Sequence, residues 1–252
     1  MCTPLRFPVY TAIERFTRNE EYMPSQQKVV DPVPTPLATL KPLLRGWFHA
    51  FAALAAVVFT IILCWQSRYD LPRLISLGIY GLSMIVLYTV SALYHLGTWR
   101  EPVRRTLRAL DHANIFVLIA GTYTPLCFNL LSGWLRPAIL ITIWLLAAIG
   151  IGMATFTLHT PRWLTASLYV AMGWVVVLAL PAFLAVVPWT AVALLLLGGI
   201  LYTIGAVVYA RRWPDPFPRV LGFHEIFHLF VIAGSVAFAI AVWAWALTFP
   251  RI

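Results

Sequence analysis

The sequence carries little charge for its length. Lys, Arg, Asp and Glu make up 11% of its 252 residues, whereas 61% are hydrophobic. Soluble domains average about 25% charged and about 45 to 50% apolar residues, so this composition excludes a water-soluble fold. The sequence also lacks closely spaced cysteines. Cys2, Cys64 and Cys127 are an odd number without a close pair, which argues against a disulfide framework and against a thiolate metal site.

The N-terminal segment lacks the features of a secretory signal peptide. Residues 1–44 mix charges of both signs with prolines and have no early apolar core. Proline opposes a long helix, and the apolar residues here are too few to form a core. We therefore expect residues 1–44 to be a cytoplasmic, largely disordered tail.

Long apolar stretches occupy the rest of the chain. Each is close to the roughly 20 residues that cross a bilayer, and breaks rich in arginine or proline separate them. We therefore predict an all-α fold: a seven-transmembrane helix bundle over residues 45–252, in a multi-pass protein of the plasma (inner) membrane. The expected spans are 46–65, 73–97, 109–131, 137–157, 164–187, 190–210 and 221–248.

Positive charge is divided unequally between the two sides that alternating helices would create. The tail and three loops on one side contain 14 Lys or Arg residues, and the other side contains 4. Because basic loops are enriched on the cytoplasmic side, the N-terminus is expected inside and the C-terminus outside. This topology accounts for the net charge of +9, and we expect no nucleic-acid partner.

Histidines lie inside the predicted spans, where ionisable groups are costly and usually face the bundle interior. His224 and His228 are four residues apart at the start of the seventh span, so both rings project from one helix face and can share a metal ion. His95, near the end of the second span, lies at matching depth. Together they predict a zinc site with one tetrahedral position open, as in catalytic zinc sites.

Two further polar residues lie near this predicted site. Ser91 is one turn before His95, and Asp111 is at the expected start of the third span. Their expected roles are a hydrogen-bonding hydroxyl, and a carboxylate that orients a ligand histidine or accepts a proton from water. The remaining histidines, His49, His112 and His159, are expected to be interfacial.

The seventh span also contains a second motif. His224, Glu225 and His228 form His-Glu-x-x-His, which in metalloproteases supplies two zinc ligands and a general base. An intramembrane protease is therefore an alternative. Such proteases need a third ligand, commonly a carboxylate in its own distant motif, and the only other intramembrane acid is Asp111. The larger set that includes Ser91 and His95 accounts for more of the polar residues.

Three stretches carry this larger pattern: Ser-Ala-Leu-Tyr-His at 91–95, Leu-Asp-His-Ala-Asn-Ile-Phe at 110–116 followed by Ala-Gly-Thr-Tyr-Thr-Pro at 120–125, and Gly-Phe-His-Glu-Ile-Phe-His at 222–228. From about residue 45 onward the chain resembles the haemolysin III branch of the progestin and adiponectin receptor family. That family lies within a superfamily of seven-helix membrane hydrolases that includes alkaline ceramidases.

The resemblance implies a zinc ion held by the histidine of the second helix and the two of the seventh, with a serine and an aspartate close by. A cytoplasmic N-terminus is implied as well. The zinc ligands carry over to His95, His224 and His228. Glu225 has no part in that zinc chemistry, and we expect it to face a neighbouring helix or the basic loops.

The leading functional hypothesis is a zinc-dependent hydrolase that cleaves an amide or ester in a membrane lipid such as a ceramide-like molecule. A bundle-centred cavity lined by aromatic and aliphatic side chains would suit the acyl chain of such a lipid. A zinc-stabilised sensor or regulator of membrane lipid or energy state, without turnover, is an alternative that needs the same residues. A cytolytic pore is disfavoured, because a channel needs polar residues at several depths. In each case the expected partner is a membrane lipid, as substrate or ligand.

Overall fold

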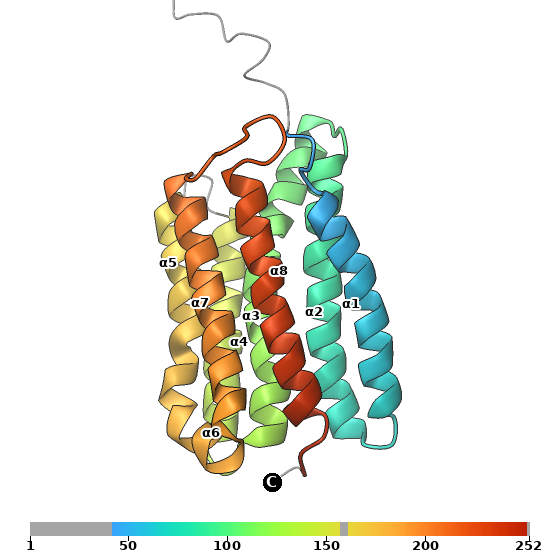
Figure 1. The fold of residues 1–252 in the computed structure, drawn as a ribbon, viewed down its shortest axis with the longest axis vertical. Coiled ribbons are helices and arrows are strands. Elements are labelled where there is room, and N and C mark those ends of the chain that lie inside the picture. Colours follow the sequence, from blue (N-terminus) through green and yellow to red (C-terminus); the bar gives the residue numbers. More distant parts are fainter. Residues whose placement is uncertain (1–41, 157–160, 251–252) are drawn as a thin grey trace, which may run out of the picture. The chain divides into compact units, whose positions relative to one another are not determined.

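The computed structural model describes residues 42–156 and 161–250, which form one helical unit (Figure 1). The predicted tail of residues 1–44 falls almost wholly outside the described residues. Seven helical spans are long and apolar enough to cross a membrane, so the prediction of an all-α seven-span protein is confirmed. The elements are α1 (Trp47–Gln66), α2 (Leu71–Leu96), α3 (Glu101–Leu130), α4 (Leu135–Phe156), α5 (Arg162–Gly173), η2 (Trp174–Ala179), α6 (Leu180–Val186), α7 (Trp189–Arg211), α8 (Phe223–Ala241) and η3 (Val242–Ala246).

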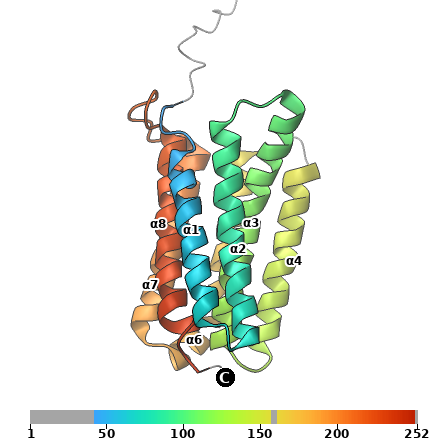
Figure 2. The same ribbon diagram turned by 90° about the vertical axis from the view of Figure 1, so that its right-hand side faces the viewer.

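Helix α3 is the central helix of the bundle. It packs between α2 and α4, as Figure 2 shows, and it also contacts α5 and η3. Of the residues in the most apolar stretch of α3, 83% are buried inside the protein, whereas the corresponding share is 22% for α1, for α4 and for the fifth span. The outer helices expose large apolar side chains instead: Phe51, Leu54 and Ile61 of α1 are 65%, 67% and 62% exposed. Continuous apolar faces of this kind fit contact with lipid and not with water.

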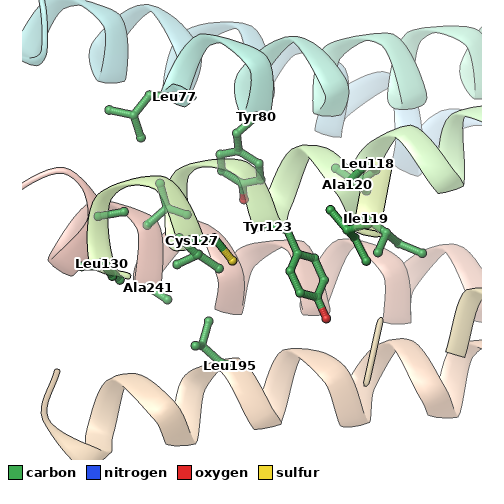
Figure 3. Close-up of a cluster of buried hydrophobic side chains, with 14 of the residues drawn as sticks. Leu77, Tyr80, Leu118, Ile119, Ala120, Tyr123, Cys127, Leu130, Leu195 and Ala241 are labelled. Atoms are coloured by element: carbon green, nitrogen blue, oxygen red, sulfur yellow. The ribbon is translucent and has the colours of Figure 1, made fainter. Parts of the chain in front are cut away.

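The buried core gathers around α3. In Figure 3, Tyr80 of α2, Tyr123 and Cys127 of α3 and Leu195 of α7 belong to one cluster of buried side chains. Helix association in lipid depends on close van der Waals packing, which small residues permit. Gly121 is such a residue, because a Cβ there would lie 2.3 Å from the Ser83 hydroxyl of α2. The close approach of α2 and α3 depends on this glycine.

Helix α3 begins earlier than predicted. Residue 109 was the expected start, whereas the helix begins at Glu101. Pro102 occupies the first turn, where proline is favoured, and Glu101 pairs with Arg104 and Arg105 one turn later. Apolarity marked only the membrane-embedded part of this helix. Asp111 therefore lies well inside α3 and not at its start.

The fifth span is not one continuous α-helix. The 3-10 segment η2 separates α5 from α6. Backbone N–H and C=O groups at this break need hydrogen-bond partners from the protein, because the hydrocarbon region of a bilayer contains no water to supply them. The Tyr123 hydroxyl supplies them: it accepts a hydrogen bond from the Val176 N–H at 2.7 Å and donates one to the Gly173 carbonyl at 2.6 Å. A side chain of α3 thus stabilises an irregular turn in its neighbour.

The two ends of the bundle differ in charge. The ends of α2 and α7 and the starts of α1, α3, α5 and α8 lie together, at the top of Figure 1. We call this the basic end, and its described arginines are Arg45, Arg100, Arg104, Arg105, Arg108, Arg162, Arg211, Arg212 and Arg219. The described arginines of the opposite end are Arg68, Arg73 and Arg136. The asymmetry agrees with the loop count from the sequence, and the inside orientation of the basic end stays a prediction.

Candidate metal centre

Three histidines from two helices face one another at the basic end. His95 is on the last turn of α2, and His224 and His228 are on the first turns of α8. Nε2 of His95 lies 3.1 Å from Nε2 of His224. One ring nitrogen from each of the three lies within 4.8 Å of the others. His95 and His228 are buried and His224 is half-buried, so the cluster is largely shielded from solvent.

The start of α8 is held by carboxylates. Glu225 accepts a hydrogen bond from the Gly222 N–H at 2.8 Å, and Asp215 accepts one from the Phe223 N–H at 3.0 Å. These bonds satisfy N–H groups that the first turn of a helix leaves free. Because the first turn is held in this way, His224 and His228 project one turn apart from the same face toward α2.

The donor set of this cluster fits a metal ion. Three imidazoles suit zinc, copper, iron or nickel. In a tetrahedral zinc site with bonds of about 2.0 to 2.1 Å, ligand nitrogens lie about 3.3 Å apart. The 3.1 Å between His95 and His224 is close to that separation. The three histidines could therefore hold a metal ion, with a fourth position left for another ligand.

Asp111 and Ser91 lie beside the histidines. Oδ2 of Asp111 is 3.8 Å from Nε2 of His95. The Ser91 hydroxyl is buried near the Asp111 carboxyl group. It makes no hydrogen bond of ordinary geometry with any described residue, so it keeps capacity for a further ligand. The structure thus brings the predicted site residues together, and their chemical roles stay predictions.

Sequence reasoning missed His49, which lies against this cluster. The prediction of an interfacial His49 is wrong, because the residue is only 3% exposed and stacks on His228 with ring centroids 3.7 Å apart. Its ring also meets Tyr88 edge-on, and neither ring nitrogen has a hydrogen-bond partner among the described residues. Its depth at the start of α1 was visible in the sequence. Its position beside His228 depends on how α1 packs against α8.

His112 points away from the three-histidine cluster. Its Nδ1 is 2.7 Å from the Arg108 carbonyl and its Nε2 is 3.1 Å from the Tyr209 hydroxyl. Both ring nitrogens are therefore engaged on the α7 side of α3. His159 lies outside the described residues, so its expected interfacial position stays a prediction.

The Glu225 carboxylate does not face the histidines as a free base. Its Oε1 is 2.7 Å from Nε of Arg45, and its Oε2 accepts the Gly222 N–H. The side chain is fully buried between these partners. Glu225 was expected to face a neighbouring helix or the basic loops, and its ionic partner is Arg45 in the segment just before α1. Both oxygens are thus bonded to groups outside the histidine cluster, which argues against Glu225 as the general base of a protease.

Seven membrane-spanning helices with a buried three-histidine cluster at one end define the class: a multi-pass integral membrane protein with a candidate metal centre. Residues 37–239 match the family described as Haemolysin-III related. The chain therefore belongs to the Haemolysin-III related family, as the motifs at 91–95, 110–125 and 222–228 predicted.

Relatives come from bacteria and from animals. The chain is 34% identical over 200 residues to Hemolysin-3 homolog of Bacillus subtilis, covering 79% of this chain and 89% of that one. It is 35% identical over 192 residues to Hemolysin-3 of Bacillus cereus, covering 74% and 83%. Monocyte to macrophage differentiation factor of Homo sapiens is 26% identical over 213 residues, covering 80% and 83%. The family match over residues 37–239 includes His95, His224 and His228.

Proposed function

We propose that the protein is a zinc-dependent hydrolase that cleaves an amide or ester bond in a membrane lipid. The observation that carries this proposal is the grouping of three imidazoles with a carboxylate, Asp111, at 3.8 Å from His95. Catalytic zinc sites use three protein ligands with one position open and a nearby group that can accept a proton. A purely structural zinc site is usually closed by a fourth protein ligand.

An apolar cavity supports a lipid as the substrate. It lies between α3, α5, α7 and α8 and is narrow, with a volume of about 80 Å³. Aromatic side chains contribute much of its lining: Tyr123, Tyr169, Trp174, Phe183, Tyr202, Phe227 and Phe238. The lining includes Leu87, Ile115 and Phe227. Along the chain these residues are one turn or less from Ser91, Asp111 and His228, respectively, so this end of the cavity is the one nearest the metal centre. An acyl chain in this cavity would place its carbonyl end toward the histidines.

His95, His224 and His228 would hold the zinc ion in this reaction. When bound, zinc supplies Lewis acidity, which makes a water molecule acidic near neutral pH and polarises an ester or amide carbonyl. The Asp111 carboxylate would accept the proton that this water loses and pass it to the leaving group. The Ser91 hydroxyl, buried beside Asp111, would hold the carboxylate and the water in place. His49 would keep the His228 ring in position by stacking.

A zinc-stabilised sensor without turnover is the second candidate. Its support is that polar contacts connect α2 to α8 at two depths: His95 meets His224 at 3.1 Å, and the Tyr88 hydroxyl donates to Ser235 at 2.6 Å. A metal ion at the His95–His224 contact would hold α2 and α8 together. In this function Asp111 would orient His95 and would have no proton to transfer.

A cytolytic pore, which the names of the Bacillus relatives suggest, has less support. The centre of the bundle is filled by packed side chains, among them the fully buried Leu77 and Tyr80. Buried polar side chains such as Ser83, Thr122 and Ser235 form hydrogen bonds within their own helix or to a neighbouring one and not a continuous polar lining. A channel would need such a lining through the whole bundle.

The test is product analysis with purified full-length protein, loaded with zinc and supplied with ceramides and phospholipids in mixed micelles. We expect fatty acid release by the wild type, loss of release in His224→Ala and Asp111→Ala, and normal release in His112→Ala. Asp111→Ala should still bind zinc. A wild type that binds zinc but releases no fatty acid from any lipid in the panel would refute the hydrolase and favour the sensor.

A further inference from the structure

A second cavity opens at the basic end, on the other side of α3 from the metal centre. It lies between α3, α4, α5 and α7 and has a volume of about 500 Å³. Two successive residues of α3 point to different sides of the helix. Asp111 faces His95, whereas His112 lines this cavity. The cavity is therefore distinct from the three-histidine cluster and from the apolar cavity described above.

The lining of this cavity has an apolar floor and a basic rim. Phe116, Met153, Ala154 and Leu168 form the floor. Arg105, Arg108 and Arg162 form the rim, and none of the lining residues in the described part of the chain is acidic. A cavity with these two parts is amphipathic, and its polar part is cationic.

The rim arginines are available to bind an anion. Arg105 makes only an exposed contact with Glu101, at 3.6 Å, and the ion pairs of the described residues involve neither Arg108 nor Arg162. The Arg162 guanidinium lies 5.6 Å from the centre of the Tyr209 ring. Arg162 also begins α5, whose first turn has no side-chain cap. The N–H groups of such a turn and the helix dipole add to the attraction for an anion.

The walls of the cavity are positioned by polar contacts. The Tyr169 hydroxyl donates to the His112 carbonyl at 2.9 Å, and the His112 ring contacts the Tyr209 hydroxyl. These bonds hold α5 and α7 to α3. Helix α4 packs mainly against α3 and only lightly against α5, so few contacts among the described residues close the cavity between these two helices. That side is where a molecule from the bilayer would enter.

We propose that this cavity binds an anionic phospholipid from the surrounding monolayer. The phosphate would lie among Arg105, Arg108 and Arg162, and an acyl chain would lie over the floor at Met153 and Ala154. Basic pockets between membrane helices recognise anionic lipid head groups in this way. Free phosphate would use the rim alone, whereas the floor requires an amphiphile. The site does not depend on the proposed hydrolase activity, because it uses none of the three clustered histidines.

The test measures lipid binding to the purified full-length protein by native mass spectrometry. Phosphatidylglycerol and phosphatidylcholine with identical acyl chains are titrated separately, and inorganic phosphate is added as a competitor. We expect one phosphatidylglycerol to bind at least about tenfold more tightly than phosphatidylcholine, given that each basic residue adds appreciably to anionic lipid attraction. Millimolar phosphate should displace little of it.

Matched variants locate the site. Arg105, Arg108 and Arg162 are changed together to Gln, and Arg100, Arg104 and Arg211 are changed together to Gln as a control with the same loss of charge at the same end. The first variant should lose the preference for phosphatidylglycerol, and the control should keep most of it. Ala154→Trp, which fills the floor and leaves the charges intact, should weaken lipid binding at least about threefold.

The outcomes distinguish lipid binding in the cavity from a general attraction of anionic lipid to the charge of the basic end. Equal losses in the two triple variants would overturn the proposal, because the preference would then come from the charge of the whole basic end. Unchanged binding in Ala154→Trp, or full displacement by phosphate, would overturn the acyl-chain part and leave a simple anion site. Zinc content, measured alongside, should be unchanged in all three variants.

Discussion

The two ends of the bundle use buried polar groups differently. At the end opposite the metal centre, Arg73 donates to the carbonyls of Leu247 and Phe249 at 2.7 and 2.6 Å. Asn129 donates to the Ser76 hydroxyl at 2.9 Å and to the Pro125 carbonyl at 2.8 Å. The terminal NH2 groups of Arg73 and the amide NH2 of Asn129 thus find acceptors within the protein, whereas Arg73 Nε and Asn129 Oδ1 have no hydrogen-bond partner among the described residues.

At the basic end, some of the polar groups beside the metal centre lack such partners. His95 and His224 meet through ring nitrogens, and His49 and Ser91 have no hydrogen bond of ordinary geometry among the described residues. Burying a polar group without a partner is costly. The unpartnered His49 and Ser91, beside three histidines that can share a metal ion, therefore indicate a place where a ligand could bind, whereas the bonds of Arg73 and Asn129 join helices at the opposite end.

The strongest test of this comparison is metal content. His95→Ala should reduce bound zinc from about one ion per chain to nearly none, because only two imidazoles would remain at the site. Asn129→Leu, at the opposite end, and His112→Ala, at the basic end but outside the cluster, should keep it. Elemental analysis of purified protein checks this. Near-stoichiometric zinc in His95→Ala would refute the three-histidine site.

The second test concerns the support of the metal centre. Arg45→Ala leaves the buried Glu225 carboxylate without its cation. We expect a loss of about 2 kcal/mol, below the roughly 3 to 5 kcal/mol of fully buried pairs, because 26% of the Arg45 side chain is exposed. In thermal unfolding in detergent this corresponds to a drop of roughly 4 to 8 °C. Glu225→Gln in the same background should recover part of it, and an unchanged midpoint in Arg45→Ala would contradict the ion pair.

The third test removes the hydrogen bonds of Asn129 at the opposite end. Asn129→Leu removes the donor to the Pro125 carbonyl, which should cost about 1 kcal/mol. Ser76 keeps its own bond to the Arg73 carbonyl, so the loss should remain local. The unfolding midpoint should fall slightly while zinc content stays full. Lower zinc in a folded Asn129→Leu protein would show that the two ends are not independent.

The fourth and smallest expected effect concerns His49. If stacking on His228 is its contribution, His49→Phe should retain zinc affinity within about twofold. His49→Ala should weaken it by about threefold, less than the roughly 10- to 100-fold of hydrogen-bonded partners around a metal. Competition with a zinc chelator measures both. Equal, large losses in Phe and Ala variants would show that an imidazole nitrogen, and not the flat ring, is needed.

Much of the fold was predictable because the bilayer sets a length. Each span needs about 20 apolar residues, which a sequence displays directly. The start of α3 was missed because residues from Glu101 to Arg108 are polar and their helix is specified by Pro102 and local ion pairs. The break at η2 was missed because the sequence around Val176 is uniformly apolar. Its partner, Tyr123, comes from another helix.

The candidate site was predictable where its residues are close in sequence. The spacing of His224 and His228 places both rings on one face of any helix. The pairing of Arg45 with Glu225 joins residues 180 positions apart, and only the packing of the segment before α1 against the start of α8 creates it. The same reason applies to the stack of His49 on His228.

The sequence by itself determined that the chain spans a membrane seven times, which end is basic, and which histidines can share a metal ion. Those properties follow from composition, loop charge and helical periodicity, which act within short segments. Tertiary structure alone decided that Glu225 binds Arg45, that His49 joins the cluster, and that three arginines border an apolar cavity between α3, α4, α5 and α7. Each of these contacts depends on how helices distant in sequence turn their faces toward one another, which hydrophobicity and local spacing do not encode.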